Sequence, residues 1–498
     1  MQRHVTRRFL LAGGAALALG GRALANAPTQ SLRPVARGTD LRIRAVGSID
    51  RLLAKYNLTG AVGFSVADVK TGLVLEDHNP TTGLPPASVT KAVTALYALD
   101  TLGPDYRFKT RLMATGPISD GVLKGDLILA GGGDPTLDTD ALAQMAANLK
   151  AKGVREVRGK FIVYDGMLPY VRSIDPEQLD HVGYSPAVSG IALNYNRVHF
   201  QWKKSGANYV VTMDARTEKY RPDVVTAKMK VVNRKVPIYT YSDASGVDAW
   251  TVAKGALGNG GARWLPVRNP AAYAGDVFRT LARANGIVLD KAKVSATLPG
   301  GAVTLVTYES APLSTILRLM LKWSNNLTAE MVGLTASVSR GRKPASLRAS
   351  ADQMNAWANK EYGMSSSKLV DHSGLGAASR LAPADLTRAL VQVRQSGVLR
   401  PLLKRIALRD SKGRPTKSHP IVVDAKTGTL FFVSALSGFM TAQDGTELAF
   451  TIFTADTDRR AKAIALKDER PPGAKAWNGR SKNLQQALIE RWGLLYGS

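Results

Sequence analysis

Apolar and polar positions follow a helical period over residues 89–102. Five apolar residues fall on one side of this stretch, namely Val89, Ala92, Val93, Leu96 and Leu99. Two prolines, Pro85 and Pro86, precede it and cannot continue a helix from upstream. The pattern predicts a turn that enters a helix, which ends near Gly103. Ser88 then lies in the first helical turn, and Lys91 projects from the same face.

Apolar residues at helical spacing or in strand-like alternation predict most other elements of the chain. Helices are expected over residues 41–56, 142–152, 271–285, 313–322 and 328–334, and near the C-terminus, where Leu484, Leu488, Trp492 and Leu495 share a face and Ser481 is a candidate helix cap. Strands are expected over residues 62–66, 73–75, 127–130, 161–164, 209–213, 227–231, 430–433, 439–442 and 447–454. Lys70-Thr71-Gly72 is expected to be a hairpin turn.

These elements predict an α+β fold of two or three domains. An antiparallel sheet covered by helices is expected from segments at both ends of the chain. Some 200 residues separate the Ser88 helix from the helices around Ser324, which indicates an inserted unit. A mature chain of about 470 residues is also too long for one core.

Ser88 and Lys91 form a candidate nucleophile and base. A lysine can take the proton of a serine hydroxyl only if it is neutral near pH 7. Burial lowers a lysine pKa, and a second cation about 4 Å away would lower it by about three units at an effective dielectric of ~20. The chain should therefore supply another lysine. A serine three residues before a lysine also arises by chance, and Ser365-Ser366-Ser367-Lys368 repeats the pattern.

Two further motifs support the Ser88 assignment. Ser324-Asn325-Asn326 lies between two predicted helices, and Lys426-Thr427-Gly428-Thr429 precedes a predicted strand. Each motif has a second match, at Ser481-Lys482-Asn483 and at Lys70-Thr71-Gly72. Only the set of Ser88, Ser324 and Lys426 keeps the chain order of the penicillin-recognising serine enzymes.

With these motifs the sequence resembles the D-alanyl-D-alanine carboxypeptidases/endopeptidases of the class C penicillin-binding proteins, the peptidase S13 family. Two longer stretches are similar to family signatures, Gly131-Gly132-Gly133-Asp134-Pro135-Thr136-Leu137 and Ser324-Asn325-Asn326-Leu327-Thr328-Ala329-Glu330. The resemblance implies a β-lactamase-like catalytic domain with two nested inserted domains. Expected boundaries are 1–25 for a signal peptide, 26–104 and 306–498 for the catalytic domain, 105–165 and 262–305 for an inserted α/β domain, and 166–261 for an inserted β-rich domain.

The resemblance also implies a mechanism of acyl transfer on peptidoglycan stem peptides. Ser88 would attack the penultimate D-alanine, Lys91 would take its proton, and Ser324 would relay that proton to the leaving amine. Asn326 would bind the substrate backbone. Substrate would be bound by the strand that contains Lys426, Thr427, Gly428 and Thr429. Within it, Lys426, Thr427 and Thr429 would hold the terminal carboxylate. The backbone N–H groups of Ser88 and Thr429 would donate to the oxyanion. β-Lactam antibiotics would acylate Ser88. No metal or organic cofactor is required.

The first 25 residues have the pattern of a cleaved export signal. A basic start at Arg7-Arg8 is followed by an apolar run to Leu19 and by Ala23-Leu24-Ala25. The paired arginines resemble a twin-arginine signal, and ordinary Sec export is the alternative. A periplasmic protein is therefore expected, without a membrane helix in the mature chain.

The composition of the chain limits which binding partners are expected. The net charge of +28 favours anionic cell-envelope polymers or a membrane surface, although a solvated basic surface without a dedicated partner is equally compatible with dispersed charges. Nucleic acid is not expected for an exported chain. The chain has no cysteine, which excludes disulfides and thiolate metal sites, and its six histidines lack metal-ligand spacing.

One segment departs from the family pattern. In Asp371-His372-Ser373-Gly374-Leu375-Gly376-Ala377-Ala378-Ser379-Arg380, Gly376-Ala377 stands where the family usually has Ser-Arg. A substrate-binding loop and a glycine-permitted surface turn are both compatible with it. Two other functions also stay open, a serine β-lactamase and a non-catalytic wall-binding or β-lactam-sensing protein. The balance between carboxypeptidase and endopeptidase activity is not predicted.

Overall fold

The computed structural model describes residues 46–341, 343–410, 413–416, 418–468 and 470–497. The predicted signal peptide and the first part of the helix predicted for residues 41–56 lie outside the described residues. The helix is confirmed over α3 (Ile49–Tyr56), which is capped by the Ser48 side chain, but the prediction is wrong at Gly47 and Ser48, which are not helical.

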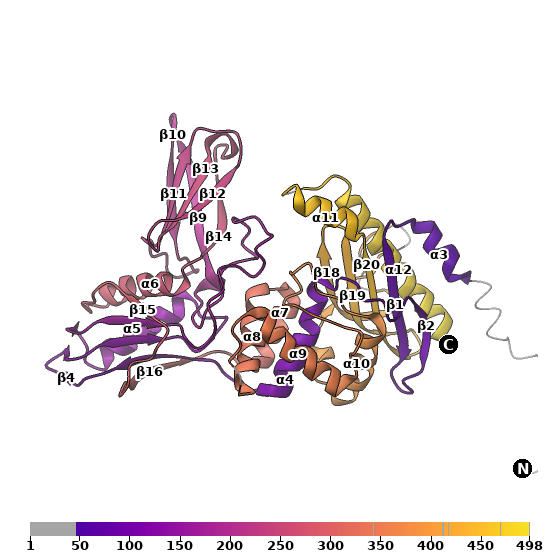
Figure 1. Ribbon diagram of the computed structural model, residues 1–498, viewed down its shortest axis with the longest axis horizontal. Helices are drawn as coiled ribbons and strands as arrows, with labels where there is room; N and C mark the ends of the chain where they lie inside the picture. Colours follow the sequence, from indigo (N-terminus) through magenta and orange to yellow (C-terminus); the bar gives the residue numbers. More distant parts are fainter. Residues whose placement is uncertain (1–45, 342, 411–412, 417, 469, 498) are drawn as a thin grey trace, which may run out of the picture. The chain divides into compact units, whose positions relative to one another are not determined.

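A six-stranded antiparallel sheet joins the two ends of the described chain (Figure 1). Its strands, in spatial order, are β17 (Lys404–Arg405), β18 (Val422–Leu430), β19 (Val433–Thr441), β20 (Glu447–Ala455), β1 (Ala61–Asp68) and β2 (Val74–His78). The first strand of the described residues, β1, pairs with the last, β20, from Ala61 opposite Ala455 to Asp68 opposite Leu448. The expected hairpin turn at Lys70-Thr71-Gly72 is confirmed between β1 and β2.

Helices cover both faces of this sheet (Figure 1). On one face, α3 and α12 (Ala474–Tyr496) pack their apolar sides against Phe64 and Phe450, and the predicted face of Leu484, Leu488 and Trp492 is buried there. On the other face lie five helices, α4 (Thr90–Leu102), α7 (Leu313–Trp323), α8 (Asn326–Ser339), α9 (Leu347–Tyr362) and α10 (Pro383–Ser396). The predicted α+β architecture of a helix-covered antiparallel sheet is therefore confirmed.

Four further sheets form between residues 109 and 309 and share no strand with the six-stranded sheet in the described part of the chain. The largest, ordered β15-β8-β6-β3-β16, contains β3 (Lys109–Ala114), β6 (Leu127–Ala130), β8 (Phe161–Tyr164), β15 (Lys293–Ser295) and β16 (Val303–Glu309). Helices α5 (Thr139–Ala151) and α6 (Pro270–Ala284) share its core. A small sheet consists of β4 (Ile118–Ser119), β5 (Val122–Leu123) and β7 (Glu156–Val157).

The other two sheets have three strands each. One is β9 (Arg197–Ser205), β10 (Asn208–Asp214) and β14 (Gly260–Pro266), and the other is β11 (Ala227–Val232), β12 (Tyr239–Asp243) and β13 (Asp248–Ala253). The strands expected at 209–213 and 227–231 are thus confirmed.

Two local predictions are wrong. The apolar run at residues 430–433 is not a strand, because β18 ends at Leu430, Phe431 and Phe432 form the turn, and β19 begins at Val433. The Lys426 motif therefore lies inside β18 and does not open a strand. Ser481 does not cap α12, which begins at Ala474, seven residues earlier. Its hydroxyl is buried and lies 2.6 Å from the Thr454 hydroxyl.

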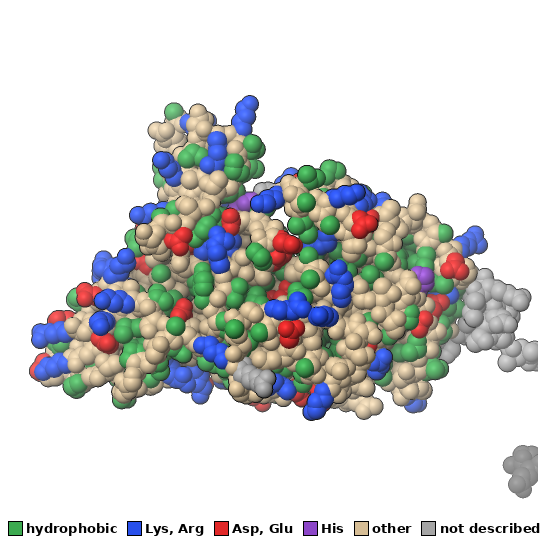
Figure 2. All heavy atoms as spheres, in the orientation of Figure 1, with side chains coloured by type: hydrophobic (Ala, Val, Ile, Leu, Met, Phe, Trp, Pro, Cys, Tyr) green, Lys and Arg blue, Asp and Glu red, His purple; other side chains and the backbone are tan. Residues whose placement is uncertain are grey.

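Within the described residues no helix is long and apolar enough to cross a membrane. Lys and Arg side chains are scattered over the visible face and interspersed with Asp and Glu (Figure 2). The basic excess of the sequence is therefore spread over this face and does not form one patch.

Candidate active site

Ser88 lies in a tight turn that leads directly into a helix. The turn is the 3-10 helix η1 (Ala87–Val89), and α4 begins at the next residue, so the prediction of Ser88 in a first turn is confirmed with tighter geometry. Strand β18 passes close beside this turn. A Cβ atom on Gly428 would lie 2.7 Å from the Pro86 carbonyl oxygen. Glycine at this position is what allows β18 to approach Ser88.

Lys91 points its amine at the Ser88 hydroxyl. The Lys91 Nζ donates to Ser88 Oγ at 2.9 Å, to Asn326 Oδ1 at 2.7 Å and to the Ser373 carbonyl at 2.7 Å. An ammonium has three donors, and these three acceptors use all of them. The site therefore fixes the amine beside the one hydroxyl from which it could take a proton.

Burial is the main reason that Lys91 can be neutral. The side chain is fully buried, and desolvation lowers its pKa to about 7 against the opposing pull of the Asp371 and Glu330 charges. The second lysine expected from the sequence is therefore not the main influence on the pKa of Lys91, since desolvation is the largest cause. The structure thus supplies a lysine whose neutral form is accessible near pH 7.

Ser324 is held between two helices by an unusual backbone conformation. It follows α7 in the left-handed region at φ 60°, and Asn325 caps the start of α8 by accepting the Thr328 N–H. A non-glycine residue with such a φ is held there by its surroundings, and such residues cluster at functional sites. The result is a hydroxyl that faces Lys426.

Lys426 bridges the second and third motifs. Its Nζ donates to Ser324 Oγ at 3.0 Å and to the Thr427 carbonyl at 2.8 Å. Burial first, and then the charge of Lys91, lower its pKa to about 6. A carboxylate placed beside it would favour the charged form and raise that pKa. The group is therefore suited to bind an anion.

Asn326 connects the lysine to a distant segment of the chain. Its Oδ1 accepts from Lys91, and its Nδ2 donates to the Tyr184 carbonyl at 2.9 Å. Tyr184 belongs to the loop between β8 and β9. The amide that is expected to meet substrate is thus already in contact with this loop.

A cavity of about 1220 Å³ opens at these groups. Among the expected site residues it is lined by Ser88, Ser324, Asn326 and Thr429. Two further walls come from residues 177–184 and 460–478. Lys91 and Lys426 are buried beneath the lining, and Thr427 and Gly428 lie on the strand that carries Thr429. The structure therefore gathers all eight sequence-predicted residues at one site.

Residues 371–375 and 379 are buried and Ala378 is exposed, so the interpretation of segment 371–380 as a surface turn holds at most for residues 376–378. Asp371, His372 and Ser373 are each at most 2% exposed. Asp371 accepts the N–H groups of Gly374 at 2.7 Å and Gly376 at 2.6 Å, which folds the segment back on itself. Its Ser373 carbonyl then meets Lys91. Whether it also contacts substrate stays a prediction.

Three groups at the site have no role predicted from the sequence. These are the buried carboxylate of Glu330, the Ser373 carbonyl and Arg460, which lines the cavity. Glu330 could have been found, since it lies four residues after Asn326 and so shares its helix face. Arg460 carries no local signal. The glycine-rich signature does not line the cavity, and its Asp134 instead accepts from the backbone and hydroxyl of Thr136.

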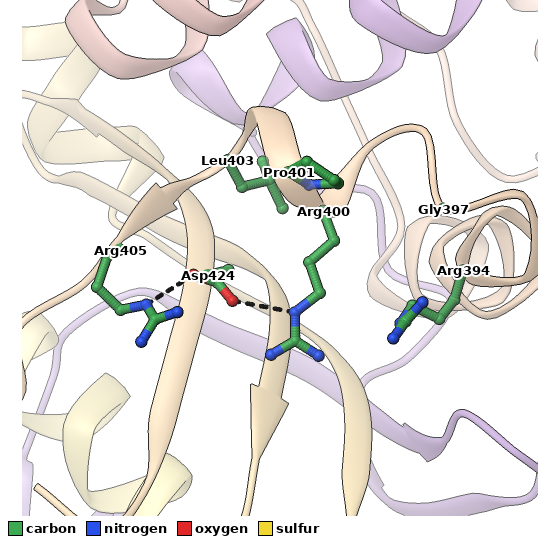
Figure 3. A pocket seen from close by; sticks show the side chains of 7 residues that line it. All are labelled: Arg394, Gly397, Arg400, Pro401, Leu403, Arg405 and Asp424. Carbon is green, nitrogen blue, oxygen red and sulfur yellow. Dashed lines mark hydrogen bonds and ion pairs between the residues drawn. The ribbon is translucent and has the colours of Figure 1, made fainter.

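A second cavity, of about 420 Å³, lies beside the start of β18 (Figure 3). Arg400 and Arg405 converge there on Asp424, at 3.0 and 2.8 Å. Arg394 and Arg400 both contact Glu447. These arginines are engaged by acidic side chains of the sheet, and we assign no ligand to this cavity.

No cluster of His, Asp and Glu suited to hold a metal ion occurs in the described ranges. The chemistry available at the large cavity is that of a serine hydroxyl, two low-pKa lysines and hydrogen-bond donors on a strand edge. This combination, on a helix-covered antiparallel sheet, defines a penicillin-recognising serine enzyme.

Comparison with known proteins identifies the family. The family model of the D-Ala-D-Ala carboxypeptidase 3 (S13) family matches residues 45–470, and the chain therefore belongs to this family of serine-type D-Ala-D-Ala carboxypeptidases. It is 32% identical over 461 residues to a D-alanyl-D-alanine carboxypeptidase of Actinomadura sp. (strain R39), covering 84% of this chain and 81% of the relative. It is 25% identical over 433 residues to D-alanyl-D-alanine carboxypeptidase DacB of Haemophilus influenzae, covering 81% and 88%.

The fold agrees with this assignment. The crystal structure of penicillin binding protein 4 from Haemophilus influenzae superposes with a TM-score of 0.72 at 20% identity, covering 89% of this chain and 99% of that one. At this identity the likeness concerns the fold alone.

Proposed function

We propose that the chain hydrolyses D-Ala-D-Ala termini or D-Ala cross-links of peptidoglycan through an acyl-enzyme on Ser88, and that β-lactams acylate the same hydroxyl. One observation carries the proposal. The Lys91 amine lies 2.9 Å from Ser88 Oγ and is fully buried, with a pKa of about 7. A base with such a pKa is matched to proton abstraction near neutral pH.

The reaction proceeds in two steps. Ser88 Oγ attacks the carbonyl carbon of the penultimate D-alanine while Lys91 takes the hydroxyl proton. The tetrahedral oxyanion is met by the N–H groups of Ser88 and Thr429. As the C–N bond breaks, Ser324 passes a proton to the leaving amine. Water then attacks the ester, and the acid and Ser88 are released.

Substrate is held by the strand edge and by α8. Lys426, Thr427 and Thr429 bind the terminal carboxylate, Gly428 lets the strand approach Ser88, and Asn326 binds the peptide backbone. Support comes from the buried position of Lys426, whose pKa is lowered to about 6. Pairing with a carboxylate restores its charge, so that a substrate with a free C-terminus is favoured over a blocked one.

The domain boundaries and cellular location are part of the same proposal. Residues 26–104 and 306–498 form the catalytic domain, 105–165 and 262–305 an inserted α/β domain, and 166–261 an inserted β-rich domain. Support comes from sheets that share no strand with the catalytic sheet among the described residues. Residues 1–25 direct export to the periplasm by the twin-arginine or Sec route. Anionic polymers of the cell envelope or a membrane surface attract the basic chain.

Digestion of muropeptides tests the proposal. Wild type, Ser88→Ala and the control Ser365→Ala are incubated with cross-linked and uncross-linked muropeptides and with a labelled penicillin, and products are followed by mass spectrometry. Wild type and Ser365→Ala should release D-alanine or separate dimers, and penicillin should add its mass to Ser88. Ser88→Ala should do neither. Penicillin labelling without any muropeptide turnover by wild type would favour a sensing protein instead.

A further inference from the structure

Arg460 is a buried cation in the wall of the active-site cavity. It lies in the first turn of α11 (Thr457–Ala465), which follows β20, and only 6% of its surface is exposed. It lines the same cavity as Ser88 and Asn326. Its Nε has no hydrogen-bond partner among the described residues, and its Nη1 makes only a long contact, 3.5 Å, to the Phe431 carbonyl. Much of its donor capacity is therefore unused among the residues that the structure describes.

Stability alone does not account for this position. Burying a guanidinium without full pairing is unfavourable. A cation in the first turn of a helix also opposes the helix dipole, and the nearby charge of Arg380 repels it. Desolvation lowers the pKa of Arg460, which marks the charged form as poorly solvated. Such a group gains most when an anion enters the cavity.

The location of Arg460 along the substrate path follows from strand β18. Lys426 and Thr427, which are proposed to hold the terminal carboxylate, precede Thr429, whose N–H is proposed to meet the oxyanion. Phe431, which Arg460 contacts, follows Thr429 by two residues and lies just beyond the end of β18. Arg460 therefore lies on the acyl side of the scissile bond, away from the leaving group.

We propose that Arg460 binds a carboxylate carried by the acyl half of the peptide substrate and so determines substrate specificity. This inference deepens the proposed function and rests on it. Among the described residues, four other basic side chains line the same cavity, Arg263, Lys467, Arg470 and Lys475, against the acidic residues Glu177 and Asp468. The excess of positive charge selects an anionic ligand, and a guanidinium is the side chain best shaped to bind a carboxylate in bidentate fashion.

A structural role is the rival explanation. The charges of Asp175 and Glu177, on the loop that forms the opposite wall, also act on Arg460. If Arg460 only held this loop in place, its loss would weaken every substrate alike and would not depend on a substrate carboxylate.

The experiment compares two isosteric peptides, N-acetyl-Glu-D-Ala-D-Ala and N-acetyl-Gln-D-Ala-D-Ala. A second pair carries the Glu or Gln one residue farther from the scissile bond. Binding of each peptide to the Ser88→Ala variant is measured by calorimetry. The same measurement is made on Ser88→Ala combined with Arg460→Met, with Arg460→Lys or with the control Lys462→Met. Lys462 is an exposed residue of the same helix and lies outside the cavity. Calorimetry needs no turnover, so a failure of the proposed reaction leaves this test intact.

We expect Ser88→Ala to bind the Glu peptide of at least one pair about tenfold or more tightly than its Gln partner, the ratio typical of a charged hydrogen bond. Arg460→Met should abolish that preference, Arg460→Lys should keep part of it, and Lys462→Met should leave it unchanged. Equal binding of Glu and Gln peptides in both pairs, or an equal loss for both in Arg460→Met, would overturn the proposal. In parallel, penicillin acylation of Arg460→Met with Ser88 intact reports on the nucleophile separately.

Discussion

Glu330 and Ser373 are joined by a buried hydrogen bond in which Glu330 Oε1 accepts the Ser373 N–H at 2.8 Å. The other carboxylate oxygen accepts the His372 N–H at 3.1 Å. The carbonyl of Ser373 in turn accepts from Lys91. The proposed base is thus oriented by a backbone carbonyl that a carboxylate on α8 holds in place.

We therefore expect Glu330→Gln to slow acylation by a β-lactam. An amide has one acceptor oxygen where the carboxylate has two, so one buried N–H loses its partner at a cost of about 1–3 kcal/mol. The charge of Glu330 would raise the pKa of Lys91, but burial and the charge of Asp371 raise the pKa of Glu330 itself to about 8, so we expect a lower rate without a shift of the acid limb of the pH–rate profile. Acylation rates across pH provide the measurement. The exposed Glu361→Gln is the control, and an identical profile for both variants would exclude this role.

The rate of acylation in the wild type should depend on pH through Lys91. The neutral amine is the reactive form and its pKa is about 7, so the rate constant should fall about tenfold per unit below pH 6 and level off above pH 8. An exposed lysine with a pKa near its ordinary value of 10.5 would instead give a rate that still rises at pH 9. Stopped-flow acylation at a series of pH values distinguishes the two, and a flat profile between pH 5 and 8 would rule out Lys91 as the base.

Gly374→Ala should disrupt the turn that carries Ser88. A Cβ atom on Gly374 would lie 1.8 Å from the Ala87 carbonyl oxygen and 2.6 Å from Thr90 Oγ1, and its φ of +75° is unfavourable for alanine. We expect a loss of about 1–3 kcal/mol in the free energy of unfolding and at least a tenfold slower acylation. Thermal unfolding and acylation kinetics would be compared with Gly255→Ala, where the added atom meets nothing within 4 Å. Equal behaviour of the two variants would contradict the geometry.

A third region offers a test of stability alone. Arg491 of α12 is 6% exposed at its side chain and contacts Glu76 of β2 at 2.7 Å, and the Trp492 indole N–H also donates to Glu76 at 2.9 Å. Glu76→Ala leaves the arginine buried without its partner, which typically costs about 3–5 kcal/mol.

Thermal and urea unfolding would measure that loss. The exposed pair of Glu156 and Arg158 provides the control, because Glu156→Ala should cost no more than about 1 kcal/mol. Equal losses for the two variants would show that burial adds nothing to the Glu76 pair.

Much of the candidate site could be predicted from the sequence because its residues belong to short motifs. Ser88 and Lys91 are one helical turn apart, and Ser324 and Asn326 flank a helix start, so local spacing sufficed. The strand register of Lys426 could not be read in this way. Phe431 and Phe432 have strand-forming side chains, yet they form a turn, because residues of α11 and α12 around Trp477 bury them. Tertiary packing overrides propensity there.

Other parts of the site depend on contacts between segments far apart in the chain. Ser481 resembles a cap in sequence, but Gly473, with φ +78°, starts the helix earlier. The serine hydroxyl instead contacts the hydroxyl of Thr454 on β20. The burial of Asp371 and the direction of Arg460 likewise depend on α8, β18 and the loop opposite. No local sequence pattern predicts contacts between such distant segments.

The pairing of β1 with β20 also sets the order in which a working enzyme can be assembled. Ser88 and the strand pair β1–β2 are synthesised early, whereas β18, β19 and β20 come near the end of the chain. Until they arrive, Phe64 and Val66 have no sheet to pack within, and Ser88 has no strand edge beside it. A chain still leaving the ribosome therefore has its proposed nucleophile but lacks the strand beside it, and catalytic competence is acquired only once β18, β19 and β20 have been synthesised.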